Sequence, residues 1–272
     1  MPPAQASFAD AGAVPLGTVT ITADGPGVYT SPEVVAPQGG FVTWVWRAHT
    51  ATQPEWVRDY LAADWTDDYG ITVETTSVRW PITTTSLMRE YNVHSGGRAF
   101  DTVTVTGFPA NHGQFEGDGY WQADNDEVTH TVYGPFATDD VLTDDLELSD
   151  APVLTSITTP ARNGVYRLGY TDADRITPTE PGFYVLVTTF DGDDRVQPYR
   201  SSPADVLERF FVPPTPEVEL PVTVITQATA TARVGEPFAD TALVQGTIPE
   251  GTYLQFRAYG PEPVDAEPNC TT

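Results

Sequence analysis

Two runs of closely spaced aspartates are the residues best suited to bind a metal ion. They are Asp172-Ala173-Asp174 and Asp191-Gly192-Asp193-Asp194. Calcium prefers clustered carboxylate oxygens on a turn, so Asp191, Asp193 and Asp194 are candidate ligands. Neither run continues into an EF-hand loop with its closing glutamate. The second run also suits a hairpin turn after a strand at residues 185–187, and we favour this interpretation over calcium binding.

The sequence contains no arrangement typical of a catalytic site. His49, His94, His112 and His130 are scattered and lack the His-x-x-x-His spacing of a metal site. No Gly-x-Ser-x-Gly nucleophile motif or phosphate-binding loop occurs. With 38 acidic residues a pair of carboxylates is always present, so such a pair does not indicate glycoside hydrolysis. We therefore expect structural or surface histidines, no catalytic residue and a protein that is not an enzyme.

Four tryptophans, Trp44, Trp46, Trp56 and Trp65, lie in one stretch interleaved with acidic residues. Trp44 and Trp46 alternate on a predicted strand and therefore share one face. Such a face is more often part of a core or of a contact between modules. The same residues would also suit a sugar-binding platform or an adhesive face, which we keep as the alternative.

The elements that position these residues are predicted to be β-strands. The chain has 25 Pro and 22 Gly, and short alternating runs recur between turn signals, whereas long helical patterns are missing. Residues 102–106 read TVTVT, which places the valines on one face of a strand and the threonines on the other. The sequence predicts an all-β protein.

An internal repeat organises these strands. The segment DTVTVTGFP at residues 101–109 matches DTALVQGTIP at residues 240–249. The segment GGFVTWV at residues 39–45 matches PGFYVLV at residues 181–187, and a closing strand follows each after a variable loop, at residues 71–73 or 210–212. The halves therefore occur in the order late, early, late, early.

This order predicts one complete module between two halves. Residues 1–70 would be the late half of a preceding module, 71–213 a complete module, and 214–272 a linker and the early half of a following module. Prolines stiffen a connection and end a strand ladder, so PPTPEVE at residues 213–219 is the predicted linker. We expect a fragment of a longer parent chain. Incomplete halves leave strand edges unpaired, and separate chains could complete each other head to tail.

The repeated DTVTVTGF segment, with VGEPF at residues 234–238 and AYGP at residues 258–261, resembles a known kind of surface repeat. It is similar to the immunoglobulin-like repeat domains of Gram-positive, actinobacterial-type cell-surface adhesins, which are related to the threonine–glutamine ester-bond domains. The resemblance covers most of the chain in order and spacing. It implies tandem immunoglobulin-like β-sandwich modules.

The resemblance also implies candidates for an internal crosslink. Thr102 would be the crosslinking hydroxyl of the complete module and Asp101 its acidic neighbour, with Thr241 and Asp240 in the same roles in the following half. Glu208 stands where the ester-bonded family has glutamine. A carboxylate lacks ammonia as the leaving group, so we expect a hydrogen-bonded pair, or no contact, in place of a covalent bond. In the first half, residues 67–73 offer neither glutamine nor glutamate.

Charge and cysteine content limit the partners and the location. The net charge of -25 with no lysine excludes nucleic acid and anionic membrane surfaces as partners. The chain shows no signal peptide and no membrane-spanning run, so export and anchor signals would lie elsewhere on the parent. We infer an extracellular, cell-surface or cell-wall location from composition and repeat type. Cys270, the single cysteine, would form a disulfide to a residue outside this chain or remain a free thiol.

These observations favour a non-enzymatic structural stalk repeat of a secreted or wall-attached adhesin, without a cofactor apart from the calcium candidates above. Its partners would be neighbouring modules of the parent chain and a host glycan or protein. The alternative is a carbohydrate- or protein-binding β-sandwich module that uses the aromatic region at residues 44–65.

Overall fold

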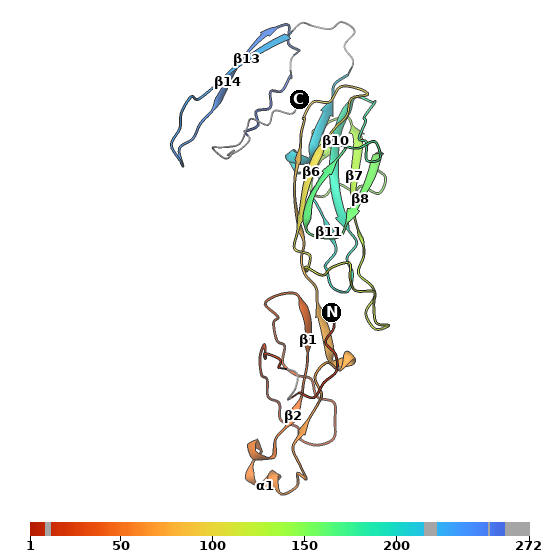
Figure 1. The fold of residues 1–272 in the computed structure, drawn as a ribbon, viewed down its shortest axis with the longest axis vertical. Coiled ribbons are helices and arrows are strands. Elements are labelled where there is room, and N and C mark those ends of the chain that lie inside the picture. Colours follow the sequence, from red (N-terminus) through yellow and green to blue (C-terminus); the bar gives the residue numbers. More distant parts are fainter. Residues whose placement is uncertain (9–11, 215–221, 250, 259–272) are drawn as a thin grey trace. The chain divides into compact units, whose positions relative to one another are not determined.

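The computed structural model describes residues 1–8, 12–214, 222–249 and 251–258 (Figure 1). They form antiparallel sheets with almost no helix, which confirms the prediction of an all-β protein. Among the described residues no helix is long and apolar enough to cross a membrane. The chain forms two compact units, residues 1–213 and 214–272. The helical turns are α1 (Glu55–Arg58) and the 3₁₀ turns η1 (Thr50–Thr52), η2 (Thr72–Glu74), η3 (Asp139–Val141) and η4 (Val206–Glu208).

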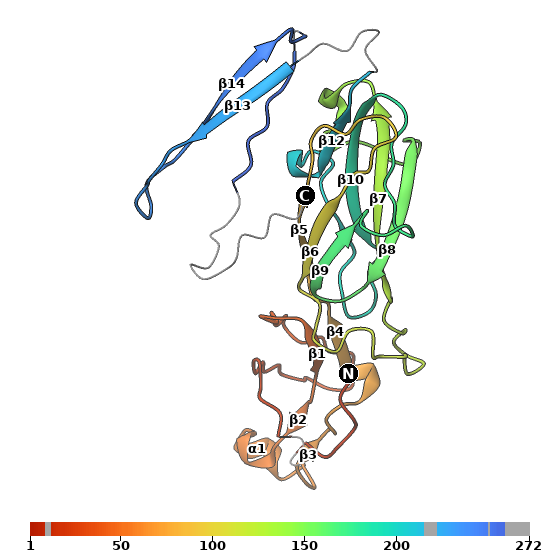
Figure 2. The ribbon, with the colours of Figure 1, turned by 45° about the horizontal axis from the view of Figure 1, so that its top comes forward.

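The main core lies between a three-stranded sheet and a five-stranded sheet (Figure 2). In the first sheet the strand order is β5-β6-β9; in the second it is β11-β10-β7-β8, with β12 also pairing with β10. The strands are β5 (Thr83–Met88), β6 (Asp101–Thr106), β7 (Glu127–Phe136), β8 (Val153–Pro160), β9 (Gly164–Leu168), β10 (Gly182–Phe190), β11 (Tyr199–Arg200) and β12 (Arg209–Val212).

Alternation along the strands explains which side chains enter this core. Val103 and Val105 of β6 are both 0% exposed, as the TVTVT pattern predicted. On the opposite sheet the rings of Tyr184 and Phe210 stack with their centroids 4.9 Å apart. β10 is buried on both faces, because Val185 and Val187 pack into a second apolar cluster on its outer side. The two sheets enclose the main core, and the second, smaller cluster lies on the outer side of β10.

The first segment of this core, residues 80–93, and its last segment, residues 209–212, run parallel where they pair. The amide of Val93 donates to the carbonyl of Phe211 at 2.9 Å, and the amide of Phe211 donates to the carbonyl of Tyr91 at 2.6 Å. Asn92 and Phe211 form a parallel bridge. Since both segments point the same way, the chain enters the core at one end and leaves it at the other (Figure 2).

The region before residue 80 contains two small strand pairs. β1 (Gly40–Thr43) pairs with β4 (Thr75–Val78), and β2 (Arg47–Ala48) pairs with β3 (Trp65–Thr66). The closing strand predicted at residues 71–73 is wrong by four residues, because residues 72–74 form η2 and the strand begins after it.

The β1–β4 pair has the same layout as the β10–β12 pair of the main core. Gly40 pairs with Val78 as Gly182 pairs with Val212. The two glycines have nearly equal positive φ angles of 141° and 146°, a conformation that disfavours a side chain. In both places a 3₁₀ turn directly precedes the closing strand. The sequence similarity between these segments is therefore matched by their strand register.

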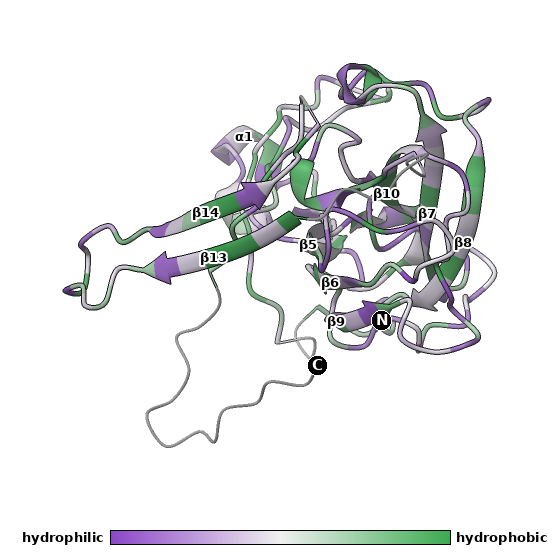
Figure 3. Cartoon of the chain, turned by 90° about the horizontal axis from the view of Figure 1, so that it is seen from above, coloured by the Kyte–Doolittle hydropathy of each residue, from purple (hydrophilic) through white to green (hydrophobic). Residues whose placement is uncertain are grey.

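The described residues of the second unit include an antiparallel hairpin, β13 (Val222–Ala228) and β14 (Asp240–Gly246). Its register equals that of β5 and β6: Ala228 pairs with Asp240 as Met88 pairs with Asp101. Apolar residues occur along both strands (Figure 3), and most residues of the hairpin are exposed. The proposed module boundaries at residues 70 and 213 remain a prediction.

Candidate functional site

A buried polar site joins the first, second and last strands of the main core. Asp101 at the start of β6 is 0% exposed, and Glu208 at the end of η4 is 2% exposed. Ser86 of β5 donates its hydroxyl hydrogen to Asp101 Oδ2 at 2.5 Å, and the amide of Thr102 donates to Asp101 Oδ1 at 2.8 Å. Ser86 is also a hydrogen-bond partner of Glu208. Two carboxyl groups and one hydroxyl are thus brought together inside an apolar core.

The electrostatics of the site favour one proton on this acid pair. Burial, and after it the negative charge of Asp101, raise the pKa of Glu208 to about 9. Glu208 is therefore a neutral acid at pH 7. Its second oxygen, Oε2, has no hydrogen-bond partner among the described residues. This arrangement can hold a proton between the two carboxyl groups.

The structure separates the predicted crosslink candidates. Asp101 and Glu208 lie in the same site, but Thr102 follows Asp101 on the strand and points to the opposite face. Of the two outcomes expected for Thr102 and Glu208, a hydrogen-bonded pair or no contact, this arrangement corresponds to no contact. Ser86, which the sequence analysis missed, provides the hydroxyl. Asp240 and Thr241 lie in the second unit, where both are exposed and the amide of Thr241 donates to Asp240 Oδ1 at 2.8 Å.

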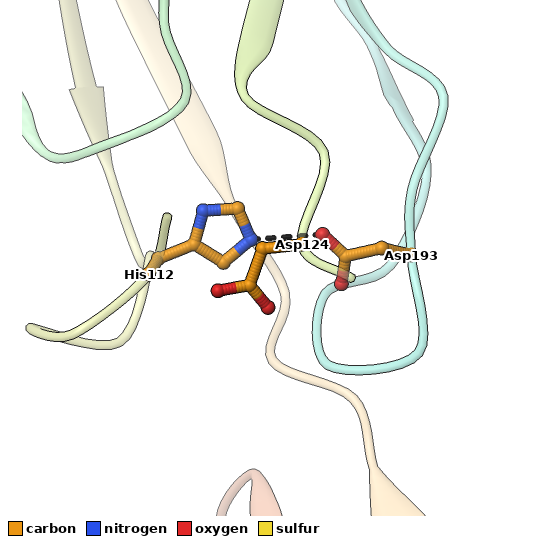
Figure 4. A group of neighbouring side chains, drawn as sticks. All are labelled: His112, Asp124 and Asp193. Carbon is orange, nitrogen blue, oxygen red and sulfur yellow. Dashed lines mark hydrogen bonds and ion pairs between the residues drawn. The ribbon is translucent and has the colours of Figure 1, made fainter. Parts of the chain in front are cut away.

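A second buried cluster contains His112, Asp124 and Asp193, with one potential ligand atom of each within 4.8 Å of the others (Figure 4). His112 Nε2 lies 2.8 Å from Asp193 Oδ2, and His112 Nδ1 lies 2.7 Å from the carbonyl oxygen of Ala161. Both ring nitrogens therefore face acceptors. Burial alone would lower the pKa of His112, but the hydrogen bonds to Asp193 and Ala161 raise it. The favoured form is an imidazolium paired with Asp193.

The other carboxylate of the cluster is paired as well. Arg195 NH1 donates to Asp124 Oδ2 at 2.9 Å, and the side chains of Arg195 and Asp124 are 6% and 1% exposed. Asp124 Oδ2 also accepts from the amide of Gly113 at 2.8 Å. Asp193 Oδ1 accepts from the amides of Arg195 and Val196. Two anions are balanced by two cations and their oxygens are occupied, so the cluster does not fit a metal ion and instead fastens two loops together.

The predicted calcium ligands do not converge. In the described part of the chain, no group of three potential ligands other than the one above lies close together. Asp193 belongs to that cluster, and Asp194 Oδ2 accepts from the amide of Gln122 at 2.7 Å. Asp191 lines a surface hollow of about 250 Å³. The aspartate run does lie in the turn between β10 and β11, as the hairpin interpretation predicted.

The other candidate residues are His130, the four tryptophans and Cys270, and those that the structure describes belong to neither buried cluster. His130 is 0% exposed between the hydroxyls of Thr188 and Thr159, and burial lowers its pKa to about 4, so it is a neutral core residue. Trp44, Trp46, Trp56 and Trp65 are 39%, 53%, 77% and 62% exposed. Cys270 lies outside the described residues.

The chain was compared with family models, curated proteins and solved structures, and none of the three comparisons found a match.

Proposed function

We propose that this protein is a non-enzymatic, load-bearing structural repeat built from tandem immunoglobulin-like β-sandwich modules. The parallel pairing of residues 91–93 with Phe211 carries the proposal. A tether pulled at both ends of the main core would load this pairing along the strands. Its hydrogen bonds would then have to break together, whereas an antiparallel hairpin pulled from one end opens one bond at a time.

Side-chain contacts reinforce the same junction. Ser86 on the first strand contacts Glu208, which directly precedes the last strand, so separating the strands would expose a buried acid pair. At the other end of the first segment, the amide of Trp80 donates to the carbonyl of Arg195 at 2.8 Å, and the amide of Gln197 donates to the carbonyl of Trp80 at 2.9 Å. The first segment is thereby fixed at two places.

The surface suits a spacer in a surface adhesin. A net charge of -25 disfavours lateral sticking between copies. One surface hollow is lined by loop residues between 116 and 123, and another by residues of β7, β10 and the adjoining loops; neither contains Glu208 or His112. We place the protein outside the cell, secreted or attached to the wall, with neighbouring modules and a host glycan or protein as partners.

A second candidate function is carbohydrate or protein binding by the aromatic region at residues 44–65. The exposure of Trp56 and Trp65, 77% and 62%, favours it. Binding to a glycan array that is lost in W56A and W65A would support this function.

Single-molecule pulling tests the load-bearing function. Cysteine handles at Arg79 and Pro213, in a C270S background, load the core through its first and last segments. Handles at Arg79 and Arg162 provide the matched control, because they load the same core in another direction. We expect a several-fold higher unfolding force for the first pair. Equal forces for the two pairs would contradict the proposal.

A further inference from the structure

The β1–β4 pair presents a face that is covered in the main core. Trp44 and Trp46 follow β1. The amide of Trp44 donates to the carbonyl of Glu74 at 2.9 Å and so continues the pairing by one residue, which puts Trp44 in the place of Leu186; by sequence spacing Trp46 takes that of Thr188. Leu186 and Thr188 are both 0% exposed, whereas Trp44 and Trp46 are 39% and 53% exposed. These tryptophans therefore correspond to core positions, but the described residues provide no sheet that covers them.

The β13–β14 hairpin presents the complementary face. In its shared register with β5 and β6, Val222 takes the place of Ile82 and Val244 that of Val105. Ile82 is 4% exposed in the main core, whereas Val222 is 45% exposed. In the described residues, the face of the hairpin that corresponds to the core side of β5 and β6 is thus largely apolar, with its β13 residues exposed and Val244 of β14 half-buried. A two-stranded hairpin without such cover is marginally stable in water.

Residues that correspond to the buried acid site occur on both of these elements, some beside the β1–β4 pair and the others on the β13–β14 hairpin. Glu74 ends η2 directly before β4, as Glu208 ends η4 directly before β12. Like Glu208, Glu74 has a buried Oε2 with no hydrogen-bond partner in the described part of the chain, and burial and then Asp67 raise the pKa of Glu74. Glu74 lies one residue beyond the stretch 67–73, in which neither glutamine nor glutamate occurs.

The other two members of the site are on the hairpin. Asp240 takes the place of Asp101, and its Oδ1 accepts from the following amide at the same distance of 2.8 Å. Thr226, which pairs with Ala242, takes the place of Ser86, which pairs with Val103, and so provides a hydroxyl on the same face. One segment therefore has the glutamate, and the other has the aspartate and the hydroxyl.

We propose that the β13–β14 hairpin of one copy packs on the β1–β4 pair of a second copy, as β5 and β6 pack opposite β10 and β12 in the main core. The partner is a second copy of this chain, because the chain itself contains both complementary faces in matching register. Thr226 and Asp240 of one copy then meet Glu74 of the next. Such a contact joins two different surfaces head to tail and leaves both ends free to continue. The inference goes beyond the proposed function, since it does not depend on load or location.

Crosslinking between two single-cysteine variants tests this contact. E74C and T226C, each in a C270S background, are mixed at moderate salt, which screens repulsion between the acidic chains, and are treated with a short bismaleimide. We expect a heterodimer on a denaturing gel. The matched control replaces T226C with Q227C, whose side chain lies on the opposite face of β13. A several-fold higher heterodimer yield with T226C supports the proposal, and equal yields overturn it.

Sedimentation of the full chain provides a measurement without cysteines near the acid site. The wild-type chain should form larger species as its concentration rises. V244D should stay monomeric, because it places a charge on the proposed contact face, whereas L243D, on the other face of β14, should behave as wild type. A wild-type chain that stays monomeric, or equal loss of association in both variants, overturns the proposal. Neither result changes the forces expected for the handles at Arg79 and Pro213.

Discussion

Ser86 and Asp101 are joined across the β5–β6 pair by a 2.5 Å hydrogen bond on the buried face, where Glu208 also lies. They are diagonal neighbours in the ladder, since Ser86 pairs with Val103 and Asp101 pairs with Met88. The site consequently depends on strand register, because a one-residue shift of either strand would turn the side chain on that strand to the other face.

Replacing Glu208 with glutamine should remove a pH dependence of stability. The pKa of Glu208 rises from 4.5 to about 9 on folding, so its stabilising contribution is complete below pH 4.5 and is lost as the pH rises towards 9. Relative to E208Q, the wild type should lose up to about 1.4 kcal/mol of unfolding free energy per pH unit in this window. Urea denaturation at pH 5, 7 and 9 measures this. E147Q, at an exposed position, is the control and should follow the wild type. If the unfolding free energy of E208Q changes with pH as that of the wild type does, Glu208 does not have a raised pKa in the folded protein.

Removing the Ser86 hydroxyl should cost more stability than removing that of Thr102. S86A leaves Asp101 in the core without one of its donors, which we expect to lower the unfolding free energy by about 1–3 kcal/mol. T102A changes a side chain on the other face and should cost less than about 1 kcal/mol. The denaturant midpoints of the two variants show which hydroxyl contributes more to the unfolding free energy. A larger loss for T102A would indicate that Thr102 is the functional hydroxyl.

Arg195 should be among the most costly charges to remove. R195M leaves Asp124 buried without its cation, which we expect to lower the unfolding free energy by about 3–5 kcal/mol. R162M, on an exposed loop, should change it by less than about 0.5 kcal/mol. Thermal or urea unfolding of both variants measures the difference. A small effect of R195M would show that the loops are held by other contacts.

Divalent cations should not stabilise the fold. The ligand atoms of His112, Asp124 and Asp193 are already occupied by protein donors and acceptors, so zinc, calcium or EDTA should leave the melting temperature unchanged. Differential scanning calorimetry with each addition is the measurement. A rise with zinc that disappears in D124N would instead identify a metal site.

The sequence predicted the strands better than the site. The alternation of Val103 and Val105 predicted β6, because period two is a local property. Thr102, the hydroxyl that the resemblance implied, lies outside the buried site because a neighbour in sequence lies on the other face, whereas Ser86 reaches Asp101 only through strand register. Glu74 was missed because the closing strand was placed four residues too early.

Contacts between loops could not be predicted from local sequence patterns. His112 and Asp193 are 81 residues apart, and both lie in loops whose paths alternation does not determine. A histidine and an aspartate far apart in a chain with 38 acidic residues give no signal before folding brings them together.

The most direct test of the account joins Asn92 to Phe211, the two residues of the parallel bridge. The variant N92C/F211C, with C270S and handles at residues 79 and 213, is pulled in oxidised and reduced form. If the first and last segments are paired, a disulfide forms and the oxidised chain loses the extension of residues 93–210, which returns on reduction. Full extension of the chain under oxidising conditions would contradict the paired arrangement and the load-bearing role built on it.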